Sequence, residues 1–159
     1  MDLLPFFQWL TGIPLSQYFL SHTWAAPIAQ VIHLVAVAVF IGALAIVDMR
    51  MLGRGLTSRP LSDIARDAQP WLIGGFLVLF ITGFPQLTST ALKQYYSPFF
   101  WWEMEALVLG LIFTFTVRRR VAMTDEALLG PVLPKVVGIL SLAIWTSVTI
   151  GARLIGLMG

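Results

Sequence analysis

The sequence predicts an all-α integral membrane protein, in which a four-helix bundle follows short interfacial amphipathic helices. Of its 159 residues, 58% are apolar and only 11% are charged, whereas a soluble domain has about 25% charged residues because its surface must be hydrated. Four apolar stretches are each long enough to cross a hydrocarbon core about 30 Å thick, which takes about 20 residues of α-helix. The chain has no cysteine, which excludes disulfides, thiolate metal sites and covalent c-type haem.

Residues 1–24 are expected to form an interfacial segment, and residues 25–159 the bundle. Proline and glycine interrupt residues 3–21 too often for a membrane span, and the aromatic side chains there suit the headgroup region. We therefore expect two short helices on the membrane surface. No Lys or Arg precedes Arg50, so this segment is expected to be retained structure and not a cleaved signal peptide.

The four spans are expected at about residues 25–52, 70–87, 99–117 and 134–157. Residues 62–68 are expected either to extend the second span or to lie beneath it. Most basic residues gather in the loops between spans one and two and between spans three and four: Arg50, Arg54, Arg59, Arg66, Arg118, Arg119, Arg120 and Lys135. By the positive-inside rule, both loops are expected in the cytoplasm and both termini on the outer side.

A stripe of small residues surrounds a histidine in the first span. Its members recur with alternating spacings of four and three: Ala29, His33, Ala36, Phe40, Ala43 and Val47. Such a stripe lies on one face of a helix, and small residues there let a second helix approach closely. His33 is therefore expected to point into the bundle.

A buried histidine suits several roles. His33 is a candidate haem or metal ligand, proton relay or quinone contact, and it is equally a candidate structural donor to a neighbouring helix. Axial ligation by two histidines would need His22, which lies eleven positions earlier and about 16 Å away along a straight helix. Only a fold-back of the surface segment at Pro27 or Thr23 would bring His22 to the same iron, and His22 is a candidate second ligand on that condition.

Three charged residues enter the spans from the outer end. Glu103 and Glu105 lie near the start of the third span, and Arg153 near the end of the fourth. Because isolated charges in hydrocarbon are costly, we expect Arg153 to pair with one of the two glutamates. Residues two apart on a helix point in different directions, and Glu103 shares a stripe with small residues, so Glu103 is the expected inward one.

Two charged residues lie at the cytoplasmic end of the first span. Asp48 and Arg50 fall where Arg118, Arg119 and Arg120 should also arrive, and a structural salt bridge is favoured there over a proton path. Nucleophile elbows, phosphate-binding loops and paired-histidine zinc motifs are missing from the sequence. We therefore expect no enzyme activity, and the few basic residues mark orientation and not a nucleic-acid surface.

An ordered set of residues resembles that of a known family. The set consists of His33, Gly42, the segment from Asp48 to Gly53, Pro70, Trp71, Gly75, Thr82, Gly83, Ser141, Trp145, Gly151 and Arg153. It resembles an uncharacterised family of small four-helix bacterial inner-membrane proteins, catalogued as a domain of unknown function. The layout is also distantly similar to four-helix b-type cytochromes and copper-resistance membrane proteins. The resemblance implies a location in the bacterial inner membrane, without implying an activity.

Two functions remain open from the sequence. The first is a non-catalytic membrane subunit or anchor of a larger, redox-related assembly, in which other membrane subunits are partners and His33 contacts b-type haem or a quinone. The second is a carrier or channel for protons, metal ions or a small solute that uses His33, Glu103 and Arg153.

Overall fold

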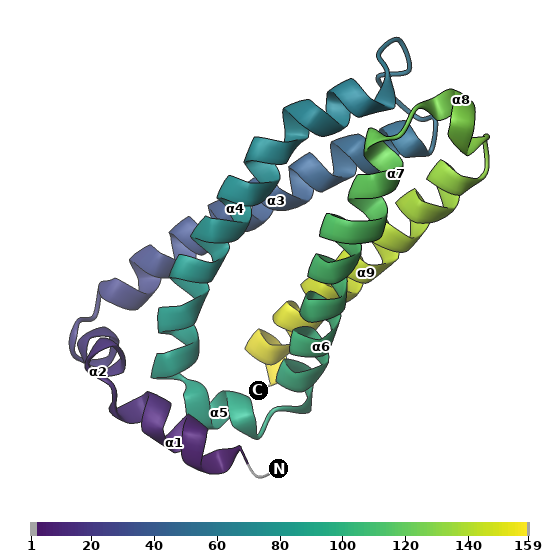
Figure 1. The fold of residues 1–159 in the computed structure, drawn as a ribbon. Helices are drawn as coiled ribbons and strands as arrows, with labels where there is room; N and C mark the ends of the chain where they lie inside the picture. Colours follow the sequence, from purple (N-terminus) through teal and green to yellow (C-terminus); the bar gives the residue numbers. More distant parts are fainter. Residues whose placement is uncertain (1–2, 159) are drawn as a thin grey trace.

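Four long helical elements and four short helices make up the computed structural model, which describes residues 3–158 (Figure 1). The long elements are α3 (Ala25–Met51), α4 (Leu61–Ser89), α6 (Pro98–Phe113) with its continuation through the π-helical turn η1 (Thr114–Arg118) and α7 (Arg119–Met123), and α9 (Leu133–Met158). The short helices are α1 (Leu4–Gly12), α2 (Pro14–Ser21), α5 (Ala91–Tyr95) and α8 (Glu126–Leu129). The described chain contains no strands, and 86% of it is helical. The all-α prediction is confirmed.

Each of the four long elements is long and apolar enough to cross a membrane. The second and third spans are longer than expected from the sequence. Residues 62–68 belong to α4, which continues through Pro70, so they extend the second span as one of the two expectations had it, and the third span runs to Met123. The protein is therefore a multi-pass membrane protein.

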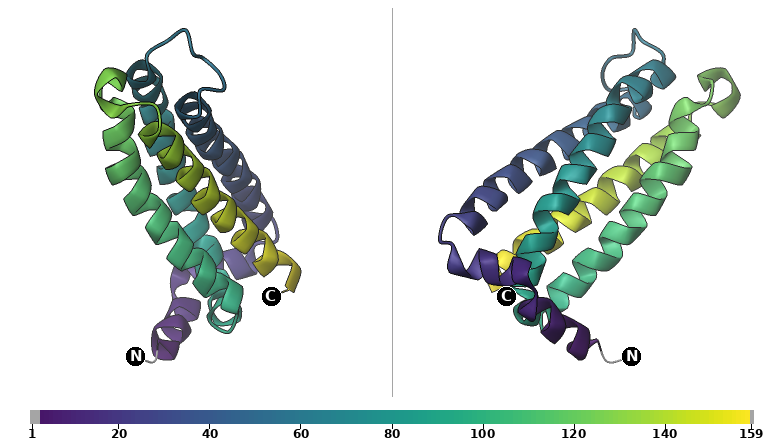
Figure 2. Two further views of the ribbon diagram at one scale, coloured as in Figure 1. Left: turned by 90° about the vertical axis from the view of Figure 1, so that its right-hand side faces the viewer. Right: turned by 60° about the vertical axis from the view of Figure 1, so that its left-hand side comes forward.

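The spans pack as two pairs joined through two contacts. Helix α3 lies along α4 and α6 lies along α9 (Figure 2), and the contacts of α3 with α9 and of α4 with α7 join the pairs. The two ends of the bundle are here called the α5 end, which also holds α1, α2 and both ends of the described chain, and the α8 end (Figure 1). An even number of spans returns the chain to the end from which it started.

Glycines set the close contacts between helices. A β-carbon on Gly75 of α4 would lie 3.2 Å from the Phe40 β-carbon of α3, and one on Gly138 of α9 would lie 3.2 Å from the Asp48 carbonyl oxygen. Between α6 and α9, a β-carbon on Gly110 would lie 3.3 Å from the Trp145 ring. Small residues at helix crossings are typical of membrane bundles, where backbone approach replaces the hydrophobic effect as the source of packing energy.

The core has two parts. The larger part fills the bundle toward the α8 end and includes Phe40, Val47 and Trp145, and the ring centroids of Phe40 and Trp145 are 4.8 Å apart. The smaller part holds α1 against α5 and α6 through Phe7, Leu10, Ala91 and Phe100. The two short helices expected before the first span are therefore present as α1 and α2, and α1 packs on the α5 end of the bundle.

Helix α3 ends in a Schellman motif. The amide of Gly53, at a positive φ of 71°, donates to the carbonyl of Arg50, and the amide of Arg54 donates to the carbonyl of Met49. Glycine adopts this left-handed conformation without a β-carbon clash, so it ends the helix here.

Candidate functional site

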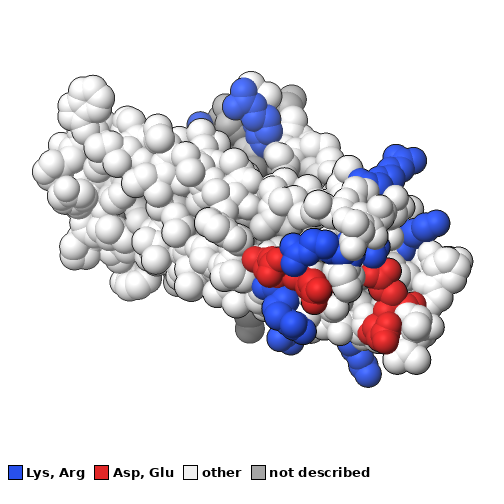
Figure 3. Space-filling model, turned by 90° about the horizontal axis from the view of Figure 1, so that it is seen from above, with Lys and Arg blue, Asp and Glu red and all other residues white. Residues whose placement is uncertain are grey.

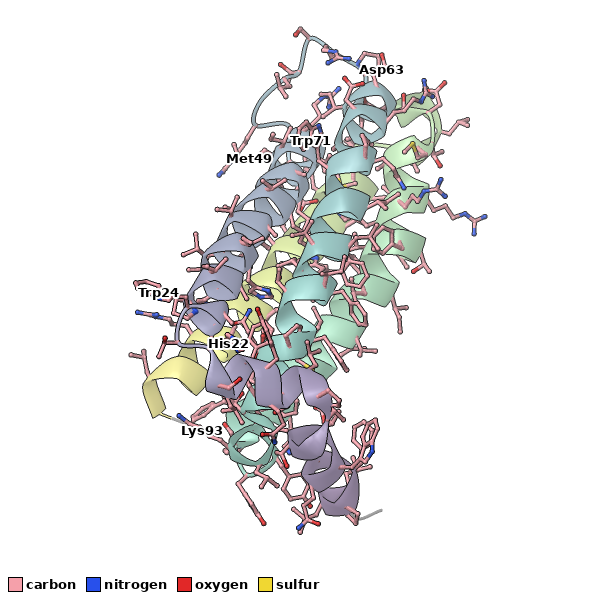
Figure 4. The ribbon with its side chains drawn as sticks, turned by 90° about the vertical axis from the view of Figure 1, so that its left-hand side faces the viewer. His22, Trp24, Met49, Asp63, Trp71 and Lys93 are labelled. Carbon is pink, nitrogen blue, oxygen red and sulfur yellow. The ribbon has the colours of Figure 1, made fainter. Side chains whose placement is uncertain are left out.

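The polar side chains of the bundle lie in separate groups. Charged residues gather at one side of the molecule in the space-filling view, while most of the remaining visible surface is uncharged (Figure 3). His22 and Lys93 lie at the end of the molecule opposite Met49 and Asp63 (Figure 4).

A buried ion pair joins three spans in the half of the bundle nearer α8. Asp48 of α3 and Arg118 of η1 are 2.7 Å apart, and their side chains are 1% and 3% exposed. The second carboxylate oxygen of Asp48 accepts a hydrogen bond of 2.6 Å from the Ser141 hydroxyl of α9, and Arg118 also donates to the Leu44 carbonyl at 3.0 Å. The salt bridge expected for Asp48 is confirmed, and Arg118 is the arginine that forms it.

Arg50 forms a different ion pair, with Glu126 of α8 at the α8 end. Its guanidinium lies 2.8 Å from a Glu126 oxygen, and that same oxygen accepts the amide of Leu61 at 2.7 Å. Glu126 therefore satisfies a free amide at the start of α4 as well as Arg50. Glu126 lies 76 residues beyond Arg50, and no local sequence pattern identified it as a partner.

His33 is hydrogen-bonded between α3 and α4. Its Nδ1 lies 2.8 Å from the Thr82 hydroxyl, and a β-carbon on Gly83 would lie 3.1 Å from its Cε1. The predicted stripe is also observed, because Ala29, Ala36 and Phe40 are buried and His33 is half-buried. The prediction that His33 faces a neighbouring helix and finds a polar partner is confirmed.

The hydrogen bonds of Thr82 indicate which ring nitrogen of His33 carries the proton. The single hydroxyl proton of Thr82 has an acceptor in the Val78 carbonyl at 2.7 Å. With that proton donated to the Val78 carbonyl, Thr82 can accept from His33, and in that tautomer Nδ1 is the donor and Nε2 keeps a lone pair. In that tautomer one ring nitrogen donates to a protein acceptor, as the non-ligating nitrogen of metal-bound histidines does.

His22 does not join His33. It is exposed at the end of α2, its ring stacks on Tyr18 at 4.2 Å between centroids, and its Nδ1 contacts the Ser21 hydroxyl and the Tyr18 carbonyl at 3.0 Å each. No group of three or more His, Asp or Glu residues within 3–158 is arranged to hold a metal ion.

The expected pairing of Arg153 with a glutamate is not found. Within the described residues, no ion pair joins Arg153 to Glu103 or Glu105, and Arg153 and Glu105 are both exposed. Glu103 is half-buried as the inward glutamate, with its β-carbon 3.3 Å from where a Gly151 β-carbon would lie. Gly151 brings the α6 backbone against α9, so helix packing and not charge governs this contact.

A pocket with many polar side chains opens at the α5 end and is here called the polar pocket. Its volume is about 420 Å³. The lining residues come from α3, α4, α5, the start of α6 and α9: Ala26, Pro27, Gln30, Gln86, Ser89, Thr90, Lys93, Gln94, Ser97 and Ile155. Gln30 precedes His33 by three residues and Gln86 follows Thr82 by four, so the pocket lies about one helical turn from the His33–Thr82 pair.

Sequence reasoning did not identify the polar pocket. A usable signal was present, because Gln30 falls on the His33 side of α3 and Gln86 on the Thr82 side of α4 at helical spacing. No comparable pattern in the sequence marked Ser97, because its position in the pocket depends on how the short helix α5 turns the chain between the second and third spans.

Comparison with known proteins places the chain in a family. No curated protein and no solved structure matches the chain. A family model described as a family of unknown function, DUF6644, matches residues 6–158. Because this match covers nearly the whole chain, the protein belongs to the DUF6644 family.

Proposed function

We propose that the protein is a non-catalytic integral membrane subunit, which anchors a larger, redox-related assembly in the bacterial inner membrane and in which His33 contacts b-type haem or a quinone. The observation that carries this proposal is the Asp48–Arg118–Ser141 network, which ties α3, η1 and α9 together inside the bundle. A network with both charges paired and hydrogen-bonded fixes the relative positions of helices and suits a scaffold.

The surface of the spans supports the anchoring role. In the most apolar window of each span, between 17% and 33% of the residues are buried inside the protein. The third span has the lowest fraction, and its exposed residues include Val108, Leu109 and Ile112. Lipid tails and the spans of partner subunits both suit this surface, because membrane helices associate by packing and not by hydrophobic exclusion from water.

The redox part of the proposal rests on His33. A lone pair on Nε2 suits either an iron ligand or an acceptor for a quinol hydroxyl. Of the two, the quinone role needs one protein acceptor, whereas six-coordinate b-type haem needs a second axial ligand that His22 does not supply. A quinone contact is therefore the version of the redox role that we favour.

Two measurements test this proposal. Purification of the tagged protein from cross-linked native membranes should yield defined membrane-protein partners in constant proportion, and recovery of the chain alone from such membranes would contradict the subunit role. A visible spectrum of the same preparation separates the haem role from the quinone role. A Soret band that disappears in His33→Leu would assign haem. A wild-type preparation without a Soret band, but with quinone in its lipid extract, would assign quinone.

A carrier or channel is the second candidate function. The polar pocket favours it, because the pocket opens at one end of the bundle close to His33. Against it, the apolar side chains of Phe40, Val47 and Trp145 fill the bundle between His33 and the Asp48–Arg118 ion pair. His33 and Asp48 are fifteen residues apart, which is about 22 Å along a helix. Substrate-dependent flux into liposomes containing only this protein would favour the carrier and weigh against the subunit.

A further inference from the structure

The polar pocket has an unsatisfied hydroxyl in its wall. Ser97 is 6% exposed, and its Oγ is the one buried side-chain oxygen or nitrogen without a hydrogen-bond partner in residues 3–158. A buried hydroxyl without a partner costs about 1–3 kcal/mol relative to one that is satisfied. Such a group in a pocket wall is explained when a ligand supplies the missing partner.

The other lining groups define what the ligand must offer. The hydroxyls of Ser89 and Thr90 already donate to the Gln86 carbonyl, at 3.0 and 2.8 Å. The donors that remain include the Lys93 ammonium, the Gln30 amide and the Ser97 hydroxyl. Lys93 is the one charged residue in the lining, and it forms no ion pair within the described chain. A ligand that satisfies these donors would be rich in acceptor oxygens and negatively charged.

The remaining wall is apolar. Ala26 and Pro27 of α3 and Ile155 of α9 line the pocket together with the donors. Both helices are membrane spans, so a hydrocarbon portion of the ligand finds an apolar surface continuous with the spans. A volume of about 420 Å³ accepts a headgroup with its linker.

We propose that the polar pocket binds a phosphate group at the α5 end, with Lys93, Gln30 and Ser97 as its donors. The phosphate of a membrane lipid is the first source, because the apolar wall then receives the glycerol and the start of the acyl chains. A free phosphate compound shares the same chemistry and is the second source. This inference is independent of the subunit proposal and of any redox role of His33, because it concerns phosphate binding by the isolated protein.

The test measures melting of the delipidated, detergent-purified protein with four probes: phosphatidylglycerol, diacylglycerol, glycerol 3-phosphate and inorganic phosphate. Phosphatidylglycerol should raise the melting temperature, and diacylglycerol, which lacks the phosphate, should not. Lys93→Gln and Ser97→Ala should each weaken phosphatidylglycerol binding about fivefold, the equivalent of about 1 kcal/mol. Ser97→Ala should melt no lower than the wild type without lipid, because it removes a hydroxyl that has no partner there.

Lys135→Gln is the matched control, because Lys135 is an exposed lysine near the start of α9, at the α8 end. It should bind phosphatidylglycerol like the wild type. A response of the wild type to glycerol 3-phosphate or inorganic phosphate, lost in Lys93→Gln, would assign the soluble source and support the same site. Equal stabilisation by diacylglycerol, or equal phosphatidylglycerol binding by all three variants, would overturn the inference, whatever partners or cofactors the protein has.

Discussion

The carboxylate of Asp48 and the guanidinium of Arg118 meet at 2.7 Å in the interior of the bundle, 70 residues apart in the sequence. Each has further partners, the Ser141 hydroxyl for Asp48 and the Leu44 carbonyl for Arg118, so neither charge depends on a single contact. In hydrocarbon, the alternative to this network is an isolated charge, which is the costliest arrangement for such a group.

Removing one partner of this pair should destabilise the fold strongly. Arg118→Met leaves the Asp48 carboxylate buried without its counter-ion, and we expect a loss of about 3–5 kcal/mol in unfolding free energy. The measurement is reversible denaturation in mixed micelles followed by tryptophan fluorescence. Arg119→Met is the control, since Arg119 is the next residue and is exposed.

The double variant Asp48→Leu with Arg118→Met separates charge from packing. It removes both buried charges together, so it should be more stable than Arg118→Met alone. If the double variant were less stable than Arg118→Met by the full unfolding free energy that Asp48→Leu costs alone, the two effects would be additive and the charges would not be coupled.

His33 and Thr82 should contribute modestly to stability. Thr82 retains its bond to the Val78 carbonyl when His33 is replaced, so His33→Leu leaves no unsatisfied hydroxyl behind and should cost about 1 kcal/mol. Thermal unfolding measures this loss. His22→Leu is the control and should have a smaller effect, because His22 is exposed. If His33→Leu lowered the unfolding free energy by well over the roughly 1 kcal/mol of one hydrogen bond, the substitution would have removed a bound ligand as well.

Neighbouring glycines of α4 should differ in their tolerance of a methyl group. Gly75→Ala places a β-carbon 3.2 Å from that of Phe40, so α3 and α4 must separate, and we expect about 1–3 kcal/mol of destabilisation. Gly74→Ala meets nothing within 4 Å and should be neutral or slightly stabilising. Thermal unfolding of both variants checks the prediction, and equal melting temperatures would show that the α3–α4 contact is looser than described.

Orientation in the membrane can be tested with fusions. Eight basic residues lie in or beside the two loops of the α8 end, which predicts a cytoplasmic α8 end and periplasmic termini. A reporter that is active only in the periplasm should work after Gly159 and fail within residues 57–62. The opposite pattern of activities would reverse the orientation.

The sequence by itself determined the number of spans and the face of α3 that is buried. Both follow from local physical requirements: a span must be about 20 apolar residues long, and residues at spacings of three and four share one helix face. For this reason His33 and Ala36 could be assigned to the packed side of α3 without knowing which helix lies opposite. The short helices α1 and α2 were similarly predictable, because proline and glycine interrupt the chain locally.

The tertiary structure alone decided which polar groups meet. Three consecutive arginines are candidates for Asp48, and the wide π-helical turn from Thr114 to Arg118 changes the rotation of the residues that follow, so ideal helix geometry does not select among them. The contact of Glu103 with Gly151, in place of a pair with Arg153, likewise depends on how far α6 slides along α9. The position of Ser97 in the polar pocket depends on several helices at once. The relative rotation and axial position of two packed helices depend on many small contacts along both of them. A local stretch of the sequence therefore does not predict them.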